Sequence, residues 1–470
     1  MGLKIGGKVE KVNGKKLSYA DFVEKYLARN QPVILTGLMD DWLACKHWVS
    51  YDGKPNLHFF SSHFGSSRIQ VADCGTKEFT DQKRMAMSVS EFIDGWVKSS
   101  GSGSGGDDGK PMLYLKDWHF VKEYPDYVAY TTPMFFLDDW LNLYLDKYSM
   151  HDDPESYQER NEISCSDYRF VYVGSKGVHG LLFMLMFSGR IVGQPMYVAG
   201  NNGIFYLQVN ITLCLTGYMK SSVYDIFEDV CKSKYPGFEK AIWWECTQEQ
   251  NEIIFVPSGW YHQVHNLEDT VSINHNWFNA YNISRVWDLL LREYHEAKGY
   301  IEDIKNICED FEGLCQRNLA ANAGMDFRDF FILVIRFAVA SLILLYQLSV
   351  NIRNIECSKS QMVRLLLFNL KNIKCISLEM KSESAWQNRG IAMINLVETI
   401  EDESFIDFCN ALARNYCMAC NHSEIISYPN QFLLEHEEIS LFDLFKSRIC
   451  NPDDLVSFLD CALKLLGIEG

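Results

Sequence analysis

Histidine and amide side chains that could bind a metal or a small ligand cluster between Asn251 and Trp277. This stretch reads NEIIFVPSGWYHQVHNLEDTVSINHNW. The imidazole of His262 can bind a transition metal through a neutral ring nitrogen, although a histidine beside Trp and Tyr on a strand is commonly an ordinary partly buried residue. Residue spacing leaves both interpretations open, and the His262/His265 pair does not make a zinc site unaided.

Three short strands are predicted to position these side chains. Residues 252–256 form an apolar β-branched run, a turn follows, and further extended runs lie at 260–265 and 270–277. Alternation along the last run separates two sets of side chains, Val271, Ile273 and His275 on one face and Ser272, Asn274 and Asn276 on the other. If both faces are enclosed, as in a small barrel, the polar face needs a ligand or metal-bound water as its partner. We interpret His265 and His275 as structural residues.

The FVPSGWYH stretch, followed by DTVSINHNW, resembles the closing strands of a Jumonji-C (JmjC) domain. The residue sequence is most similar to the branch of JmjC domain-containing protein 4. The resemblance implies a double-stranded β-helix that uses Fe(II) and 2-oxoglutarate, and a protein substrate, a lysine of the translation termination factor. It also implies that His262 is the last of three iron ligands and that Asn274 contacts 2-oxoglutarate.

The other two iron ligands that the resemblance implies are missing from the sequence. In JmjC domains the strand after a Phe-Val-Tyr-Val-Gly run continues through a Thr-Pro-x-His-x-Asp type of motif. Here the chain reads VHGLLFMLMFSGR, the expected His and Asp are absent near Phe183–Met186, and the next acid is Asp225. A facial Fe(II) site needs two imidazoles and one carboxylate, so His262 alone cannot hold the metal.

A displaced reading frame would explain this gap. Codons for Leu182 to Ala199 can be chosen so that a frame starting one base earlier encodes Pro-Leu-His-Ala-Asp-Val-Phe-Arg-Ser-Tyr-Ser-Trp-Ser-Ala-Asn-Val-Cys-Gly. That peptide is similar to a JmjC strand pair. We hypothesise a displacement over about 178–220, caused by a gene-model error or a pair of indels. The alternative is a natural apolar replacement in a pseudoenzyme.

Composition narrows the class of protein. With 470 residues and 47% hydrophobic content, the chain can bury a sizeable core. A formal charge of −17 argues against direct nucleic-acid binding, while a basic protein substrate stays compatible. Fifteen scattered cysteines and a start without an apolar signal segment predict reduced thiols and a cytoplasmic or nuclear location.

The predicted fold class is α+β, with three parts. Residues 1–134 form an N-terminal α/β lead-in that contains a flexible loop at 99–109, because a Ser/Gly/Asp run cannot bury anything. Residues 135–285 form the JmjC barrel, which is jelly-roll or cupin-like, and residues 286–470 form a helical region. Within the barrel, Pro195 and several glycines predict irregular backbone over 178–220.

Two further segments invite functional interpretations that we set aside. Residues 330–346 are apolar, but they fall just short of a membrane span and carry Arg336 near the centre, so we expect a buried helix and no membrane. Cys417 and Cys420 with His422 have zinc-like spacing. No second pair follows nearby, so we expect no zinc there.

These observations favour an Fe(II)- and 2-oxoglutarate-dependent protein hydroxylase, which is a dioxygenase. We expect its activity to be impaired in this chain, because the His-x-Asp motif is missing. Two alternatives remain. The first is a JmjC module that binds proteins without catalysis, which the missing His-x-Asp favours. The second is a histone lysine demethylase, which neighbouring reader domains would favour, although none is apparent.

Overall fold

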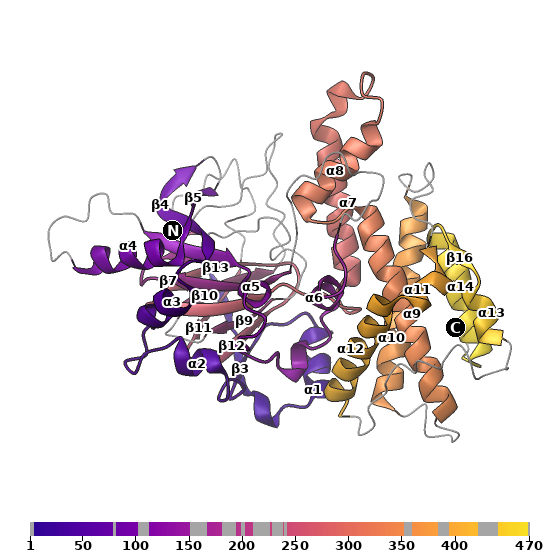
Figure 1. Ribbon diagram of the computed structural model, residues 1–470, viewed down its shortest axis with the longest axis horizontal. Coiled ribbons are helices and arrows are strands. Elements are labelled where there is room, and N and C mark those ends of the chain that lie inside the picture. The colour runs from indigo at the N-terminus through magenta and orange to yellow at the C-terminus, as the bar shows by residue number, and fades with distance from the viewer. Residues whose placement is uncertain are drawn as a thin grey trace. The chain divides into compact units, whose positions relative to one another are not determined.

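The computed structural model describes residues 4–78, 81–101, 112–150, 167–180, 194–198, 203–209, 226–227, 238, 242–351, 360–383, 394–421 and 440–468. The chain forms two compact units. Unit 1 comprises Met1–Pro133 and Asp167–Trp277, and unit 2 comprises Met134–Ser166 and Phe278–Gly470. Strands dominate the first unit and helices the second, so the fold class is α+β (Figure 1).

Unit 1 contains two sheets. The nine-stranded sheet has the order β2-β3-β12-β9-β14-β7-β6-β4-β5 and the five-stranded sheet the order β1-β11-β10-β13-β8. Their strands are β1 (Ile5–Lys8), β2 (Glu10–Asn13), β3 (Val33–Thr36), β4 (Arg68–Glu78), β5 (Asp81–Ser88), β6 (Leu113–Trp118), β7 (Arg169–Gly174), β8 (His179–Gly180), β9 (Gln194–Val198), β10 (Gly203–Val209), β11 (Trp243–Gln248), β12 (Glu252–Val256), β13 (Trp260–Asn266) and β14 (Thr270–His275). From β7 to β10, and again from β11 to β14, successive strands alternate between the two sheets.

Apolar residues of the sheets form the core of this unit. Ile254 and Trp260 are buried together with Val9, Ile34 and Val256. Ile254 lies on β12, which pairs with β3 on one side and β9 on the other. All five residues of β12 are buried, and a strand buried on both faces carries a continuous apolar run, as residues 253–256 do.

Short helices connect the N-terminal strands of unit 1. They are α1 (Tyr19–Phe22), continued by a π-helical turn (Val23–Leu27), α2 (Leu43–His47), α3 (Leu57–Phe64), α4 (Val89–Gly101) and α5 (Phe120–Glu123), and a 3-10 turn lies at Gly14–Lys16. A capping box begins α4: the Glu91 backbone N–H donates to Ser88 Oγ at 3.2 Å, and the Ser88 N–H donates to Glu91 Oε2 at 2.7 Å.

The predicted loop at 99–109 begins too early. Residues 99–101 are the last residues of α4, because each residue added to an existing helix gains a backbone hydrogen bond. Residues 102–109 lie outside the described residues.

The prediction of irregular backbone over 178–220 is wrong for β9 and β10. Both strands pair with their neighbours without a register shift. Pro195 is tolerated because it is the second residue of β9 and its partner there is Phe255 of β12, while the pairing with β14 begins at Met196. Residues 181–193 lie outside the described residues.

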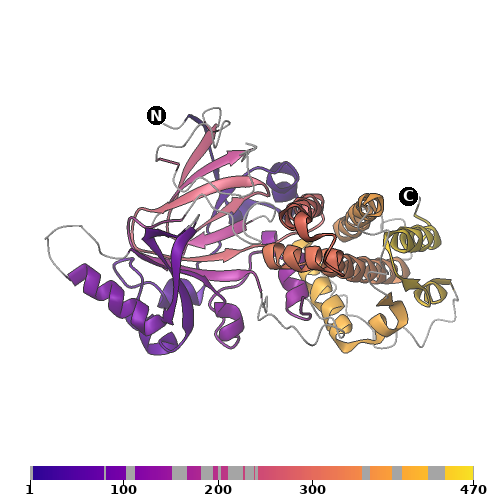
Figure 2. The same ribbon diagram turned by 90° about the horizontal axis from the view of Figure 1, so that it is seen from above.

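The described residues of unit 2 are helical apart from connecting turns and one small two-stranded pair. Its elements are a 3-10 turn (Met134–Phe136), α6 (Trp140–Leu145), α7 (Ile283–Tyr300), a 3-10 turn (Glu302–Ile304), α8 (Phe311–Ala323), α9 (Phe327–Asn351), α10 (Gln361–Ser382), β15 (Ile394–Asn395), α11 (Leu396–Glu401), α12 (Glu403–Ala419), α13 (Ser440–Phe445), β16 (Arg448–Ile449) and α14 (Pro452–Leu465). Helix α9 contacts α10, α12 and α14, and Figure 2 shows these helices from above.

The boundary between the units differs from the predicted parts. Residues 134–150 and 278–285 belong to the helical unit. The sequence-based prediction placed residues 135–150 and 278–285 in the barrel. The physical reason is side-chain packing: the ring of Trp140 stacks on Phe337 of α9 with centroids 4.3 Å apart.

Helix α9 contains the apolar segment predicted to be a buried helix. Its part Phe327–Ser349 is long and apolar enough to cross a membrane, and 83% of its most apolar window is buried inside the protein. Arg336 is accommodated there by two tyrosines of the same unit. Its guanidinium donates to Tyr144 Oη at 2.5 Å and lies 3.6 Å from the centre of the Tyr148 ring. The buried helix is therefore confirmed.

Candidate active site

The predicted site lies on β13 and β14, which belong to different sheets. β13 pairs with β10 and β8, whereas β14 lies between β7 and β9. All six residues of β14 are buried, so both of its faces are enclosed. This is the condition under which the Ser/Asn face of β14 was predicted to line a polar interior.

His262 has the properties of a metal-binding imidazole. It lies opposite Leu207 of β10, and only 9% of its surface is exposed. Burial lowers its pKa, partly offset by a contact of Nδ1 with the Trp260 carbonyl at 3.4 Å. The ring is therefore neutral at physiological pH and has a lone pair to offer.

Asn274 carries a buried polar atom that has no hydrogen-bond partner among the described residues. The residue is 3% exposed, and its Nδ2 donates to Asn276 Oδ1 at 3.2 Å. No described residue donates a hydrogen bond to Asn274 Oδ1. An unpaired buried acceptor costs stability unless a ligand or water supplies the donor, so this atom fits a ligand-facing position.

A polar chain beside Asn274 was missed by the sequence analysis. The side chain of Tyr172 on β7 contacts the Asn274 amide, and its hydroxyl donates to Asp117 Oδ1 at 3.0 Å. Arg84 donates to the other oxygen of Asp117 at 2.8 Å. Asp117 has a φ of 55°, a left-handed conformation that is uncommon outside glycine, at a bulge in β6. No local sequence signal identifies these contacts.

The two histidines interpreted as structural have protein partners. His275 Nε2 lies 2.5 Å from the Tyr130 hydroxyl, and burial, followed by the charge of Arg169, lowers its pKa well below the usual value. His265 Nε2 lies 2.7 Å from Gln263 Nε2, and its ring meets the edge of Phe227. These contacts keep both rings in fixed orientations.

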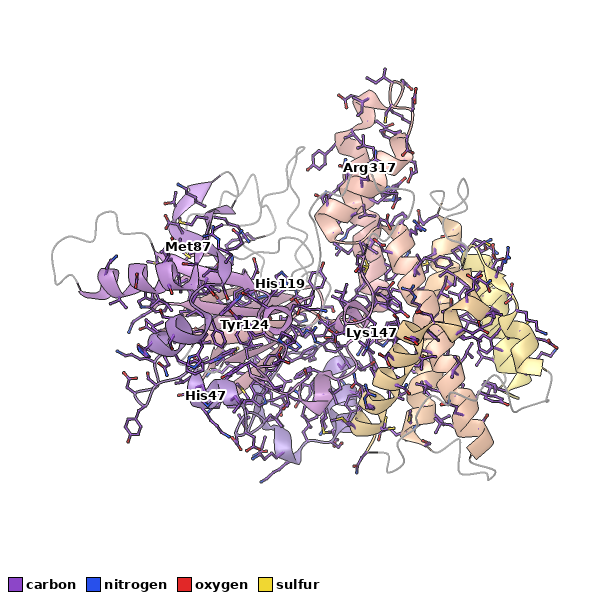
Figure 3. The ribbon with its side chains drawn as sticks, viewed as in Figure 1. His47, Met87, His119, Tyr124, Lys147 and Arg317 are labelled. Atoms are coloured by element: carbon purple, nitrogen blue, oxygen red, sulfur yellow. The ribbon has the colours of Figure 1, made fainter. Side chains whose placement is uncertain are left out.

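Two carboxylates of unit 1, the buried Asp167 and the half-buried Asp117, are already bonded to other side chains. Asp167, which is fully buried, lies 2.6 Å from His119 Nδ1 through one oxygen and 3.1 Å from Arg169 Nε through the other. Figure 3 labels His119. The hydrogen bonds to Asp117 occupy both of its oxygens as well. Neither carboxylate is free to bind a metal at His262.

The donor set for a three-ligand metal centre is incomplete. The described part of the chain contains no group of three or more His, Cys, Asp or Glu side chains that could hold a metal ion. Residues 183–186, near which the resemblance implies the other two ligands, lie outside the described residues. The sequence itself contains no Asp or Glu between Asp167 and Asp225. The residues present therefore do not fit a His-carboxylate-His iron site.

The zinc-like motif in unit 2 gains no support. Cys417 and Cys420 are free thiols, as are all the other described cysteines. Burial, followed by the charge of Asp138, raises the pKa of Cys420 to about 12. A thiol in that state is a poor metal ligand, because zinc binds the thiolate. His422 lies outside the described residues.

Comparison with known proteins matches this chain to JmjC proteins. A family model described as "JmjC domain, hydroxylase" matches residues 233–277. The chain is 47% identical over 468 residues to the Arginine-specific demethylase JMJ20 of Arabidopsis thaliana, covering 98% of this chain and 97% of that protein. It is 34% identical to the 2-oxoglutarate and iron-dependent oxygenase JMJD4 of Danio rerio, covering 67% of this chain and 71% of that protein. The human JMJD4 is 30% identical, with coverages of 67% and 72%.

Proposed function

This chain belongs to the JmjC family of 2-oxoglutarate and iron-dependent oxygenases, and we propose that it is a protein hydroxylase of that family whose own metal centre is incomplete. The family's cofactors are Fe(II) and 2-oxoglutarate, and its members act on protein substrates. When bound, the two cofactors supply the oxidising chemistry, while the protein supplies ligands, orientation and exclusion of water.

The alternating strands of unit 1 support a double-stranded β-helix. In such a barrel two sheets face each other and successive strands cross between them. The chain alternates in this way from β7 to β10 and from β11 to β14. We assign the cupin-like barrel to this part of unit 1, with the ligand site between its sheets.

The roles of two residues follow from this assignment. His262 is neutral and buried, as the last iron ligand of the site must be. Asn274, with its unpaired buried oxygen, is proposed as the contact for 2-oxoglutarate. Tyr172 and Asp117 are proposed to orient the Asn274 amide through their hydrogen bonds.

The single observation that carries the proposed impairment is the carboxylate-free run from Tyr168 to Tyr224. A facial iron site needs a carboxylate beside its two imidazoles, and both the buried Asp167 and the half-buried Asp117 are bonded elsewhere. We therefore propose that the chain with this sequence is inactive as an oxygenase. A displaced frame over about 178–220 accounts for the loss in an otherwise intact relative of active enzymes.

For the reaction, we propose lysyl hydroxylation of the translation termination factor, which is the activity that the resemblance to the JmjC domain-containing protein 4 branch implies. A second candidate is arginine demethylation, the activity named for the Arabidopsis thaliana relative, whose match covers 98% of this chain. Both reactions act on a long basic side chain of a protein. A histone lysine demethylase and a non-catalytic binding module are the remaining alternatives.

Iron binding tests the impairment directly. We would titrate Fe(II) anaerobically, by calorimetry, into the chain as it stands and into a repaired chain whose residues 178–220 follow the displaced frame. We expect no stoichiometric binding by the first and one iron per chain in the second, lost again with His262→Ala. Stoichiometric iron binding by the unrepaired chain would refute the proposal.

Two further measurements separate the alternatives. The first is the transcript sequence across codons 174–225. If it lacks the displaced frame and encodes the present residues, the non-catalytic binding module is favoured. With the repaired chain, mass spectrometry of termination-factor and methylarginine peptides distinguishes a mass increase by one oxygen atom from loss of a methyl group. No change in either peptide would refute both candidate reactions.

A further inference from the structure

The helical hairpin formed by α7 and α8 in unit 2 ends in an exposed turn. Residues 300–310, here called the hairpin tip, connect the two helices. Trp287 and Tyr294 of α7 pack on Phe327, the first residue of α9, with centroid distances of 4.9 Å and 5.0 Å to its ring. Figure 1 shows the hairpin extending beyond the other helices of unit 2, and Figure 3 labels Arg317 part of the way along α8.

The hairpin tip exposes apolar side chains. Ile307 is 81% exposed, which makes it the most exposed large aliphatic side chain among the described residues. Tyr300 is 47% exposed at the end of α7. Asp310 caps α8 by accepting the Gly313 N–H at 3.0 Å, so the backbone beside Ile307 is fixed. Ile307 and Tyr300 therefore offer apolar surface that a partner could remove from water.

Carboxylates surround these apolar side chains. Residues 301–312 contain five carboxylates and a single lysine: Glu302, Asp303, Glu309, Asp310, Glu312 and Lys305. Glu302 is 3.1 Å from Lys305, and Asp310 is 3.4 Å from Arg317. Asp303 and Glu309 have no ion pair with any residue that the structure describes, and both are exposed. Unpaired negative charge therefore lies on both sides of Ile307.

We propose that the hairpin tip docks a lysine- or arginine-rich segment of the protein substrate. Its cations contact Asp303 and Glu309, and one of its apolar side chains packs on Ile307 and Tyr300. The inference rests on the proposed function for the identity of the partner, because the sequence around a target lysine or arginine supplies cationic side chains. Charge complementarity guides the encounter, and the apolar contact adds affinity.

Charge also disfavours two other occupants. A second copy of this chain carries the same formal charge of −17 and the same acidic tip, so two tips repel each other. Nucleic acid is repelled for the same reason. A basic protein segment is the partner whose charge matches this surface.

Peptide binding tests the proposal without iron or 2-oxoglutarate. The probe is a fluorescein-labelled peptide of four Lys-Leu-Arg-Ser repeats, and a peptide with Glu in place of every Lys and Arg is the control. Fluorescence polarisation measures the Kd of each peptide for the full chain and for the double variant Asp303→Lys, Glu309→Lys. The matched control, Glu24→Lys with Glu401→Lys, makes the same charge change at exposed carboxylates away from the hairpin tip.

We expect the double variant at the tip to weaken binding of the basic peptide about tenfold, and the matched control to change it less than about twofold. Ile307→Ser should weaken binding about threefold or more at all salt concentrations, because an apolar contact is not screened. The acidic peptide should not bind.

Three results would overturn the proposal. Equal losses in both double variants would show that only the overall charge matters, and unchanged binding by the Ile307→Ser variant would remove the apolar contact. A wild-type dimer in sedimentation velocity that Ile307→Ser converts to a monomer would assign the tip to a second copy. If the repaired chain modifies neither peptide but tip-dependent binding persists, the proposed function fails and the docking surface stands.

Discussion

Replacing Asp138 in unit 2 should change how the stability of the protein depends on pH. Asp138 is 1% exposed, and its Oδ1 accepts hydrogen bonds from Trp140 Nε1 and from the Tyr416 hydroxyl, both at 2.9 Å. Its Oδ2 has no hydrogen-bond partner among the described residues. Burial raises its pKa to about 6, and the side chains of Tyr416, Trp140 and Asn279 only partly oppose this shift.

The direction of this pH dependence follows from proton linkage. The native state binds a proton to Asp138 more tightly than the unfolded state, whose pKa is close to 3.8. The resulting stability is fully present below the unfolded pKa and is lost as pH rises to about 6. Above that pH the native state carries the whole cost of an ionised buried carboxylate, which is about 3 kcal/mol.

Asp138→Asn keeps the Oδ1 acceptor and removes the charge. The new amide donor is buried without a described partner, which costs ~1 to 2 kcal/mol at every pH. That cost cancels when the change in unfolding free energy is compared between two pH values. We expect the unfolding free energy of the variant, measured relative to that of wild type, to be about 2 kcal/mol higher at pH ~7.5 than at pH ~4.5.

Urea denaturation followed by far-ultraviolet circular dichroism measures this difference, because the helices of unit 2 dominate the signal. Asp41→Asn, at an exposed carboxylate, is the control and should show a pH dependence close to that of wild type. Tyr416→Phe removes one donor and should steepen the loss of stability with rising pH. An Asp138→Asn variant that tracks wild type at both pH values would refute the reasoning.

Three further substitutions test the packing and the capping interactions. Ser88→Ala removes the cap of α4 and should cost about 1 kcal/mol in chemical denaturation, whereas Ser88→Thr should restore most of it. Ile254→Ala, at a fully buried position of β12, should cost about 2 to 5 kcal/mol, and a cost below ~1 kcal/mol would contradict the close packing seen there. Arg336→Met removes the hydrogen bond to Tyr144 and the contact with the Tyr148 ring, and should lower stability by about 1 to 2 kcal/mol with little dependence on salt.

The sequence alone determined the local elements of this protein. The apolar run of β12 and the long helix α9 were both predicted, because each depends on residues within a few positions of one another. The turn before β13 belongs to the same class, since Gly259 adopts a φ of 80°. The absence of a carboxylate between Asp167 and Asp225 is also a property of the sequence that no fold can change.

Only the tertiary structure decided which of these elements meet. It placed β13 and β14 in different sheets and brought Tyr172 and Asp117 beside Asn274. It also enclosed Asp138 with Tyr416, which is 278 positions away in the sequence. Such contacts depend on the packing of distant segments around a shared core, and the hydrophobic patterns that drive this packing do not specify which polar side chains become neighbours.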